Sequence, residues 1–345
     1  MLDTFAIDYP ASDLEAEFAG LYAETEARLQ RLVGASGRIA LMTGEGMVAL
    51  WGALKSSVGP GDRVVSVAAG MFGAGIGAMA DGLGAAVQYD RYPSSAVPDP
   101  DRVRELVRRH RPHLVTLVHC ETPSGTLAPL AELCAAVRDA APDALIYVDA
   151  VSSAAGTPVR VDDWGIDLCL LGAQKALSAP PDAAMIAVSE RAWTRIDTVG
   201  YAGYDALGPW RHVGPPGSFP YTPSWHATAA IHAACGLVLD EGLDAVFGRH
   251  AAVAAHCRDR ARTLDLQLFP DDEAAASPTV TGLRVPGGWT WERLDQALRE
   301  HGVALGGNWG ELADKVFRIG HMGDQARMDL VDGAFDVLEQ VLRAG

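Results

Sequence analysis

The chain has 345 residues, of which 49% are hydrophobic and 21% are charged, and its formal net charge is −16. This length and composition predict a packed globular protein with one large and one small domain. The acidic balance excludes a nucleic-acid-binding class, because phosphate backbones require a clustered basic face.

Other large classes are excluded by local patterns. No apolar stretch approaches the roughly 18 residues that cross a bilayer, and the N-terminus lacks the regions of a signal peptide, so we expect no membrane partner. Five cysteines form no CxxC pair, and their odd number argues against a disulfide scaffold, so we expect a cytoplasmic protein. The histidine spacings match no zinc pattern, and no metal is expected.

The first expected element is a helix that begins at a capping box, Ser12 to Glu15. From residue 38 to about 188, short apolar runs alternate with helical segments. The runs are almost continuously apolar, which is typical of strands covered on both faces, and the alternation predicts an α/β fold with a largely parallel sheet. The expected strands are 39–42, 64–67, 114–118, 145–148, 168–171 and 184–188, and the expected helices between them are 47–57, 74–83, 101–110 and 130–140.

Residues 200–223 are rich in Gly and Pro and are expected to form a loop and domain connection, followed by a helix over 227–240. We therefore predict a large domain over 1–240 and a small α+β domain over 241–345. The elements expected in the small domain are strands at 280–285, 303–305 and 316–319, a helix near 291–299 and a last helix that ends at 344.

Polar side chains follow two of the buried runs. Asp149 comes directly after the run 145–148, and Lys175 comes shortly after the run 168–171. Ligands of open α/β sheets bind beyond the carboxyl ends of the strands. A buried amine can become a nucleophile toward an aldehyde, and a buried carboxylate can pair with a protonated pyridine nitrogen. Alone, either residue could equally be a capping Asp or a surface Lys, but their joint placement favours a cofactor site.

The surrounding sequence carries a family resemblance. The segments DAVSSAAG at 149–156 and GAQKALSAPP at 172–181 resemble the cofactor motifs of class V aminotransferases, the alanine–glyoxylate and serine–pyruvate group. The resemblance extends from about Ala6 to the end of the chain. It implies a fold-type I protein, a pyridoxal 5′-phosphate cofactor and a homodimer. Further matches, in the order of the family, are ETPSGT at 121–126, TP at 222–223, SPT at 277–279 and FRIGHMG at 317–323.

The resemblance also implies roles for single residues. Lys175 would form an imine with the cofactor and later move a proton, and Asp149 would bond the ring nitrogen. Phe72 and Val151 would cover the two faces of the ring, and Thr122 would meet its phenolic oxygen. The remaining implied contacts are to the cofactor phosphate, from Gly46 and Met47 at a helix start, from Gln174, and from Thr222 of the neighbouring subunit.

Arg318 resembles the family residue that grips the substrate carboxylate, which a planar guanidinium can hold with two hydrogen bonds. Several short phrases resemble the pyridoxamine–pyruvate subgroup, in which Glu45 would contact the amine substrate; alternatively, Glu45 is an anion favoured at a helix start. Trp309 stands where that subgroup has a second arginine. The pocket would then have one fewer cation, or would prefer a bulkier apolar group. Family members usually begin with a Gly-Pro segment that crosses to the partner, and this sequence starts after it.

The predicted function is a pyridoxal-phosphate-dependent aminotransferase. It would move an amino group between a small amine or amino acid and a 2-oxo acid of the pyruvate or glyoxylate type. The alternative is a lyase or decarboxylase on the same scaffold, because the same cofactor linkage supports several bond cleavages. A cofactor-binding regulator without turnover is a third hypothesis.

Overall fold

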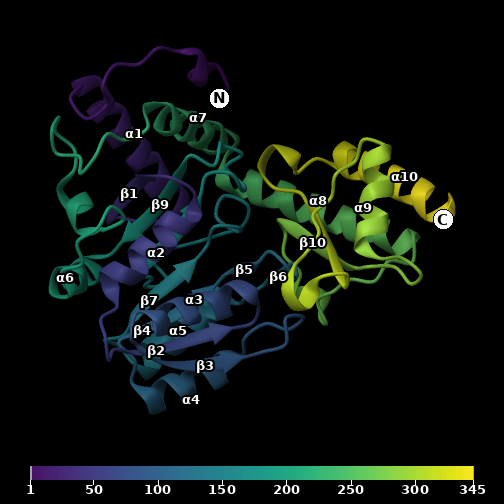
Figure 1. Cartoon of the computed structure of the whole chain (residues 1–345), viewed down its shortest axis with the longest axis horizontal. Coiled ribbons are helices and arrows are strands. Elements are labelled where there is room, and N and C mark those ends of the chain that lie inside the picture. The colour runs from purple at the N-terminus through teal and green to yellow at the C-terminus, as the bar shows by residue number, and fades with distance from the viewer. Residues whose placement is uncertain (1, 345) are drawn as a thin grey trace.

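A computed structural model describes residues 2–344 of the chain. The N-terminal elements are η1 (Leu2–Ala6) and α1 (Ala16–Val33), and α1 packs beside α7 (Trp225–Glu241). Figure 1 shows the central sheet and these helices in one part of the molecule and the elements after α7 in another. Among the described residues, no helix is both long and apolar enough to cross a bilayer.

The central sheet has seven strands in the order β1-β9-β8-β7-β4-β2-β3. The pairs β2–β3, β2–β4, β4–β7 and β7–β8 are parallel, whereas β9 runs antiparallel to both of its neighbours. The predicted largely parallel sheet is therefore confirmed. Its strands are β1 (Arg38–Thr43), β2 (Arg63–Ala68), β3 (Ala86–Arg91), β4 (Leu114–Val118), β7 (Leu145–Asp149), β8 (Leu168–Gly172) and β9 (Ala183–Val188).

The three strands β7, β8 and β9 are buried along their whole length, as their continuous apolar runs predicted. A small hairpin lies beside the sheet, made of β5 (Cys120–Glu121) and β6 (Thr126–Leu127). The remaining helices of this part are α2 (Gly46–Ser57), α3 (Met71–Gly82), α4 (Pro100–His110), α5 (Leu130–Ala140), α6 (Glu190–Val199) and the short η2 (Gly208–His212).

The C-terminal part is a two-stranded antiparallel sheet, β10 (Val280–Arg284) and β11 (Val316–Gly320), covered by helices. Its core includes the fully buried rings of Phe317 and Phe335. The boundary expected between 240 and 241 falls at the end of α7 and stays a prediction. The helical elements here are α8 (Leu243–Thr263), α9 (Trp291–Glu300), α10 (Met328–Ala344) and the short η3 (Glu273–Ala275), η4 (Gly310–Leu312) and η5 (Gly323–Gln325).

Two local predictions are wrong. The Ser12 hydroxyl does not cap a helix but donates to the carbonyl of Pro223 at 2.5 Å, and α1 begins after Glu15 without a side-chain cap. Residues 303–305 do not form a strand, and only the next residue, Gly306, pairs with β11, in an isolated bridge to Arg318.

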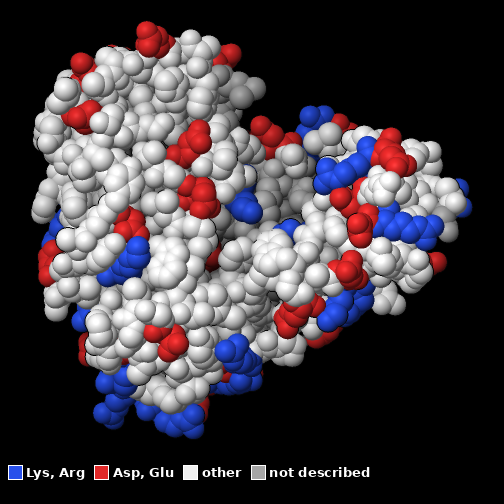
Figure 2. Space-filling view, viewed as in Figure 1, with Lys and Arg blue, Asp and Glu red and all other residues white. Residues whose placement is uncertain are grey.

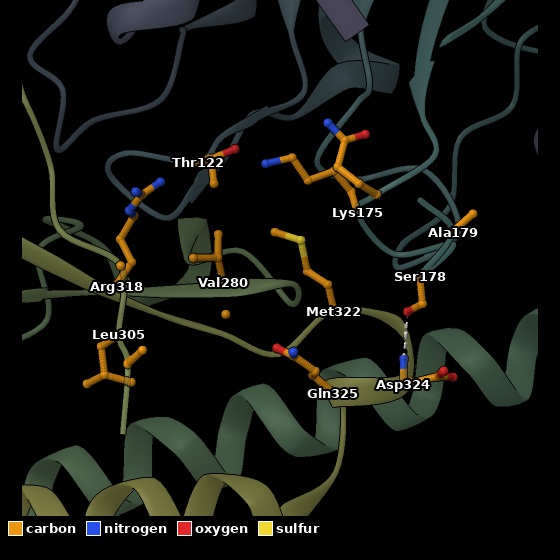
Figure 3. A pocket seen from close by; sticks show the side chains of 14 residues that line it. Thr122, Lys175, Ser178, Ala179, Val280, Leu305, Arg318, Met322, Asp324 and Gln325 are labelled. Atoms are coloured by element: carbon orange, nitrogen blue, oxygen red, sulfur yellow. Dashed lines mark hydrogen bonds between the residues drawn. The ribbon is translucent and has the colours of Figure 1, made fainter. Parts of the chain in front are cut away.

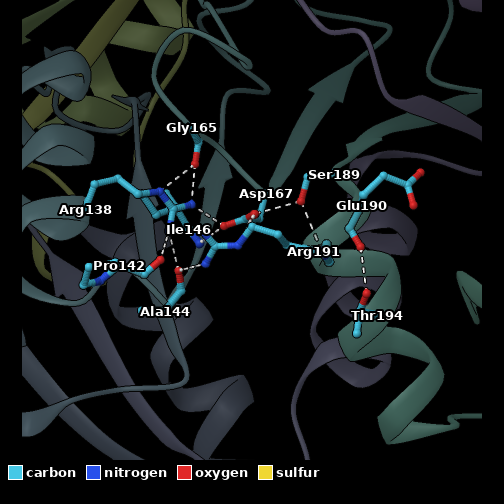
Figure 4. Close-up of polar contacts among 11 residues, drawn as sticks. Arg138, Pro142, Ala144, Ile146, Gly165, Asp167, Ser189, Glu190, Arg191 and Thr194 are labelled. Carbon is cyan, nitrogen blue, oxygen red and sulfur yellow. Dashed lines mark hydrogen bonds and ion pairs between the residues drawn. The ribbon is translucent and has the colours of Figure 1, made fainter.

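The amino ends of the central strands are tied together by one buried carboxylate (Figure 4). Asp167 is 2% exposed and accepts hydrogen bonds from the Ile146 N–H at 2.9 Å and the Ser189 hydroxyl at 2.7 Å. It also forms ion pairs with Arg138 and, at 3.7 Å, with Arg191. Asp167 therefore joins β7, β8, α5 and α6 at the end of the sheet opposite the one where Asp149 lies.

Candidate active site

A cavity of about 610 Å³ lies between the loop that follows β8 and the C-terminal part of the chain. Lys175 and Thr122 line it from one side, and Arg318 and Met322 line it from the other (Figure 3). The face seen in Figure 2 is hollowed between the two parts, and Lys or Arg atoms are visible in the hollow. The structure thus brings the predicted cofactor lysine and the predicted carboxylate-binding arginine to one space.

Asp149 and Lys175 meet because their strands are parallel neighbours. Asp149 is the last residue of β7 and lies opposite Leu170 of β8, and the chain then turns through Gly172 to Lys175. Burial is the largest cause of the pKa shift of each group, and the charges of Asp149 and Lys175 offset a smaller part of it, so the two groups interact electrostatically. The fold therefore brings the ends of β7 and β8, and with them Asp149 and Lys175, to the same edge of the sheet, and the roles of the two residues stay a prediction.

Burial dominates the protonation of both groups. It raises the pKa of Asp149 to about 6, although the Val151 N–H donates to this carboxylate at 2.9 Å. Burial, and next the charge of Arg318, lowers the pKa of Lys175. A lysine whose pKa is lowered carries more of the neutral amine at physiological pH, which is the form that attacks an aldehyde.

The start of α2 already holds a carboxylate. Glu45 is the N-cap residue, and its side chain accepts the Met47 N–H at 2.9 Å. Gly46 is buried, and a Cβ there would lie 3.7 Å from Val151. An external anion that used the Met47 N–H would therefore replace the Glu45 side chain. The expected phosphate contacts at Gly46 and Met47 stay a prediction.

Val151 lies against the turn that precedes Lys175. A Cβ on Gly172 would come within 2.7 Å of its Cγ1 atom, so only glycine lets the two segments approach this closely. Gln174, which also lines the cavity, has a buried side-chain oxygen without a hydrogen-bond partner among residues 2–344. An unpaired buried oxygen is costly and marks a place where a ligand or water could donate a hydrogen bond.

Phe72 and Thr122 lie on different elements, the start of α3 and the β5–β6 hairpin. The Thr122 hydroxyl donates to the Ser152 hydroxyl at 2.5 Å. The Phe72 N–H donates to the carboxylate of Glu121 at 3.1 Å. Sequence reasoning did not single out Glu121, because nothing in the pattern showed that its side chain faces α3 rather than the cavity.

Arg318 belongs to the middle of β11, and its Nη2 group donates to the Gly307 carbonyl at 2.6 Å. Its Nε–H is buried and has no acceptor in the described part of the chain, so a substrate carboxylate could supply one. Trp309 is 49% exposed, and its ring lies against the Arg318 guanidinium. Thr222 is exposed in the loop before α7 and does not line the cavity, and its predicted contact with another subunit stays untested.

The loop after Lys175 is fastened to the C-terminal part. The Ser178 hydroxyl accepts the Asp324 N–H at 2.9 Å (Figure 3). Within the C-terminal part, the Nε2 atom of His250 on α8 accepts the neighbouring Gly323 N–H at 2.9 Å. Gly323 has a φ of 58°, and a Cβ there would collide with Ser178. The two walls of the cavity therefore touch next to the predicted cofactor lysine.

Comparisons with known proteins agree with this geometry. The sequence model of the family described as aminotransferase class-V matches residues 9–316. The pyridoxamine–pyruvate transaminase of Mesorhizobium japonicum is 32% identical over 325 residues, which cover 91% of this chain and 81% of that protein. The alanine–glyoxylate aminotransferase of Oryctolagus cuniculus is 32% identical over 319 residues, which cover 88% of this chain and 79% of that protein.

A solved structure is similar over nearly the whole chain. The pyridoxamine–pyruvate aminotransferase from Mesorhizobium loti superposes with a TM-score of 0.93 at 30% identity, covering 99% of this chain and 88% of that one. Both the sequence motifs and the arrangement of the sheet are therefore those of one family. The chain belongs to the class-V aminotransferase family and is a fold-type I, pyridoxal-phosphate-dependent aminotransferase.

Proposed function

We propose that the enzyme moves an amino group between a small amine or amino acid and a 2-oxo acid of the pyruvate or glyoxylate type. The observation that carries this proposal is the cavity that Lys175 and Arg318 line from opposite sides. One side chain suits an aldehyde and the other suits a carboxylate, and an aminotransferase needs both. The relatives named above act on such pairs, and lyase or decarboxylase chemistry finds no support among them.

The residues present fit pyridoxal 5′-phosphate. Asp149 is a buried carboxylate with one oxygen bonded to the Val151 N–H, which suits a partner with a protonated ring nitrogen. Gly46 and Gly172 leave space around Val151, which would cover one face of the ring, and Phe72 would cover the other. When bound, the cofactor supplies an aldehyde and an electron-withdrawing ring. We propose that Gly46, Met47 and Gln174 hold its phosphate, once the Glu45 side chain leaves the Met47 N–H.

Lys175 would carry out the proton transfer. Its burial and the neighbouring Arg318 charge favour the neutral amine, which would bind the cofactor and, once the substrate amine has displaced it and the lysine is free again, would accept a proton from the substrate carbon. Asp149 would stay ionised beside a cationic ring, because an opposite charge offsets the cost of its burial. These two residues are the proposed catalytic groups.

Arg318 would bind the carboxylate of the 2-oxo acid through its free Nε–H edge. Trp309 would form an apolar wall beside that carboxylate, and Glu45 would face the amine substrate from the start of α2. The pKa of Lys175 is lowered by burial and by Arg318, and the charge of Glu45 offsets a small part of that lowering, so Glu45 acts electrostatically on the site. A site with one arginine and one aromatic wall suits substrates with a single carboxylate.

We further propose a homodimer in which Thr222 reaches the phosphate site of the partner. Two large exposed side chains, Met47 and Tyr204, lie around a hollow beside α2, where a second copy would cover them. The proposed domains are 1–240 and 241–345. All five cysteines are unpaired and buried, which suits a reducing compartment such as the cytoplasm.

The test is a screen of amine donors and 2-oxo acids with the holoenzyme, followed by the visible absorbance of the cofactor. We expect each productive amine to convert the aldehyde form to the amine form, and pyruvate or glyoxylate to reverse the change in equal amounts. Lys175→Ala should bind cofactor without the borohydride-reducible linkage. Donor breakdown with release of ammonia or carbon dioxide, and no consumption of 2-oxo acid, would contradict the proposal.

A further inference from the structure

We infer that Glu121 is a positioning residue that holds the start of α3, and with it the Phe72 ring, at a fixed separation from Thr122. The inference rests on the proposed function, because Phe72 and Thr122 are its proposed cofactor contacts. Glu121 itself does not line the cavity and is assigned no contact with substrate or cofactor.

The Glu121 carboxylate is a bridge between two elements. It is 3% exposed at the end of β5. Its Oε2 atom accepts the Phe72 N–H at 3.1 Å, and its Oε1 atom accepts the Gly73 N–H at 2.7 Å. Both donors lie in the first turn of α3, where helix N–H groups have no partner inside the helix. One side chain thus satisfies two such groups from a different part of the chain.

The neighbouring glycines leave the space that this side chain occupies. A Cβ on Gly70 would lie 2.6 Å from Cδ of Glu121, and a Cβ on Gly73 would lie 2.8 Å from the Val67 carbonyl oxygen. Both distances are shorter than a carbon atom can tolerate. The buried carboxylate therefore fits because Gly70 lacks a side chain, and Gly73 lets the start of α3 approach the backbone of β2. The start of α3 is shaped around Glu121.

The charge of Glu121 suits this bridge. An ionised carboxylate accepts two N–H donors at once, and the positive end of a helix dipole favours it. Burial raises the pKa of Glu121 to about 7 although its two N–H bonds lower it, and the charge of Asp149 adds a smaller increase, so the carboxylate is fully ionised only above neutral pH. A glutamine of the same size would accept only one of the two donors and would turn its own N–H₂ group toward the other.

The geometry links two proposed cofactor contacts through one residue. Thr122 follows Glu121 directly in the chain, and its hydroxyl is fixed by Ser152. The backbone of Phe72 is bonded to the Glu121 side chain. The length of that side chain therefore sets how far the aromatic ring stands from the hairpin. Loss of the bridge would leave the ring free to shift while Thr122 stays in place.

The test measures cofactor binding and the visible circular dichroism of the bound cofactor, with turnover as a separate readout. Glu121→Gln should raise the cofactor dissociation constant by on the order of ten-fold, because one of the two N–H donors would then face the amide N–H₂ group instead of an oxygen. It should also reduce the dichroism amplitude. Gly70→Ala keeps the Glu121 carboxylate, but the new methyl group would displace it from the start of α3. This variant should therefore also reduce the dichroism amplitude. The matched control is Glu132→Gln on the exposed face of α5, which should change neither.

A mutant cycle separates positioning from general weakening of the fold. In a Phe72→Leu background there is no ring to position, so Glu121→Gln should add less than two-fold to the dissociation constant. Additive effects, or a variant with unchanged affinity and dichroism, would overturn the inference. Both outcomes leave the proposed function intact, because that function fails only if Lys175→Ala retains the reducible linkage or the amine screen gives no transfer.

Discussion

The guanidinium of Arg318 lies 5.5 Å from the centroid of the Trp309 ring. The cation is thus supported by an aromatic face on one side while its Nε–H remains without an acceptor in the described chain. This arrangement leaves the hydrogen-bonding edge of the arginine available and holds the group in place, which is what recognition of a carboxylate requires.

Replacing Arg318 by Ala should raise the KM for pyruvate or glyoxylate by roughly ten- to a hundred-fold, because a charged hydrogen bond is lost. Arg318→Lys should recover only part of the loss, since an ammonium group cannot form the paired bonds. Steady-state kinetics with varied 2-oxo acid measures the effect, and the cofactor dissociation constant is the control. Equal KM values for Arg318→Ala and the unaltered enzyme would exclude the assigned role.

Trp309 should contribute less than Arg318 to the binding of the 2-oxo acid. Trp309→Ala should raise the same KM by roughly two- to five-fold, because an exposed cation–π contact is worth about 0.5–1 kcal/mol. The comparison of interest is between a small and a bulky 2-oxo acid. If Trp309 forms an apolar wall, Trp309→Ala should raise the KM for the bulky 2-oxo acid more than the KM for pyruvate. An equal rise in both KM values would argue that the ring only supports Arg318.

Asp149→Asn should have opposite effects on function and on stability. In the holoenzyme it should slow amino transfer by roughly 10²–10³-fold, as removal of a charge-stabilising group in an active site typically does. In the cofactor-free protein it should stabilise the fold. The pKa of Asp149 is raised from 3.8 to about 6 by burial, so the ionised group costs the folded state roughly 3 kcal/mol at neutral pH.

The sign of that stability effect follows from the linkage between protonation of Asp149 and unfolding. Below about pH 3 the carboxyl is protonated in both the folded and unfolded states, and the two proteins should be equally stable with respect to this group. The advantage of Asn should grow as pH rises from about 4 to about 6 and then stay constant. Urea unfolding of the cofactor-free proteins at several pH values measures it, and a variant less stable than the parent at pH 8 would contradict the prediction.

Asp167→Ala should destabilise the protein by about 2–4 kcal/mol, because it leaves the buried Ile146 N–H and the part-buried Ser189 hydroxyl without their acceptor, and an unsatisfied buried group costs about 1–3 kcal/mol. The activity of the folded fraction should be unchanged, since Asp167 lies at the end of the sheet opposite the one where Asp149 lies. The matched control is Asp163→Ala, whose pair with Arg160 is exposed at 3.7 Å and should contribute less than about 1 kcal/mol. A large loss of specific activity with little change in the unfolding midpoint would show that the two ends are coupled.

The buried strands and the placement of Asp149 and Lys175 could be predicted because one physical rule governs them. Strands covered on both faces are continuously apolar, and polar residues just beyond them stand out. The edge strand β3 was missed for the converse reason, since its sequence AVQYDR is half exposed and mixes apolar with polar side chains. The capping box predicted at Ser12 was wrong because the Ser12 hydroxyl donates to the carbonyl of Pro223, a residue far away in the sequence.

The remaining site features depend on distances that no local pattern contains. Glu45 bonding the Met47 N–H follows from its place before α2, whereas the bond from Phe72 to Glu121 joins residues between which β3, α4 and β4 intervene in the sequence. The unpaired Nε–H of Arg318 likewise depends on how β11 packs beside residue 307. Such contacts are properties of the assembled fold.

The separation between the Asp167 network and the cavity bears on how this enzyme could acquire new substrates. Substitutions of pocket side chains usually reduce the stability of the fold. A protein that is only just stable enough to function tolerates few of them. Because the ion pairs around Asp167 stand apart from Lys175 and Arg318, they can be strengthened without altering turnover. Laboratory selection for a different amine should therefore advance further from a parent reinforced at the amino ends of β7 and β8.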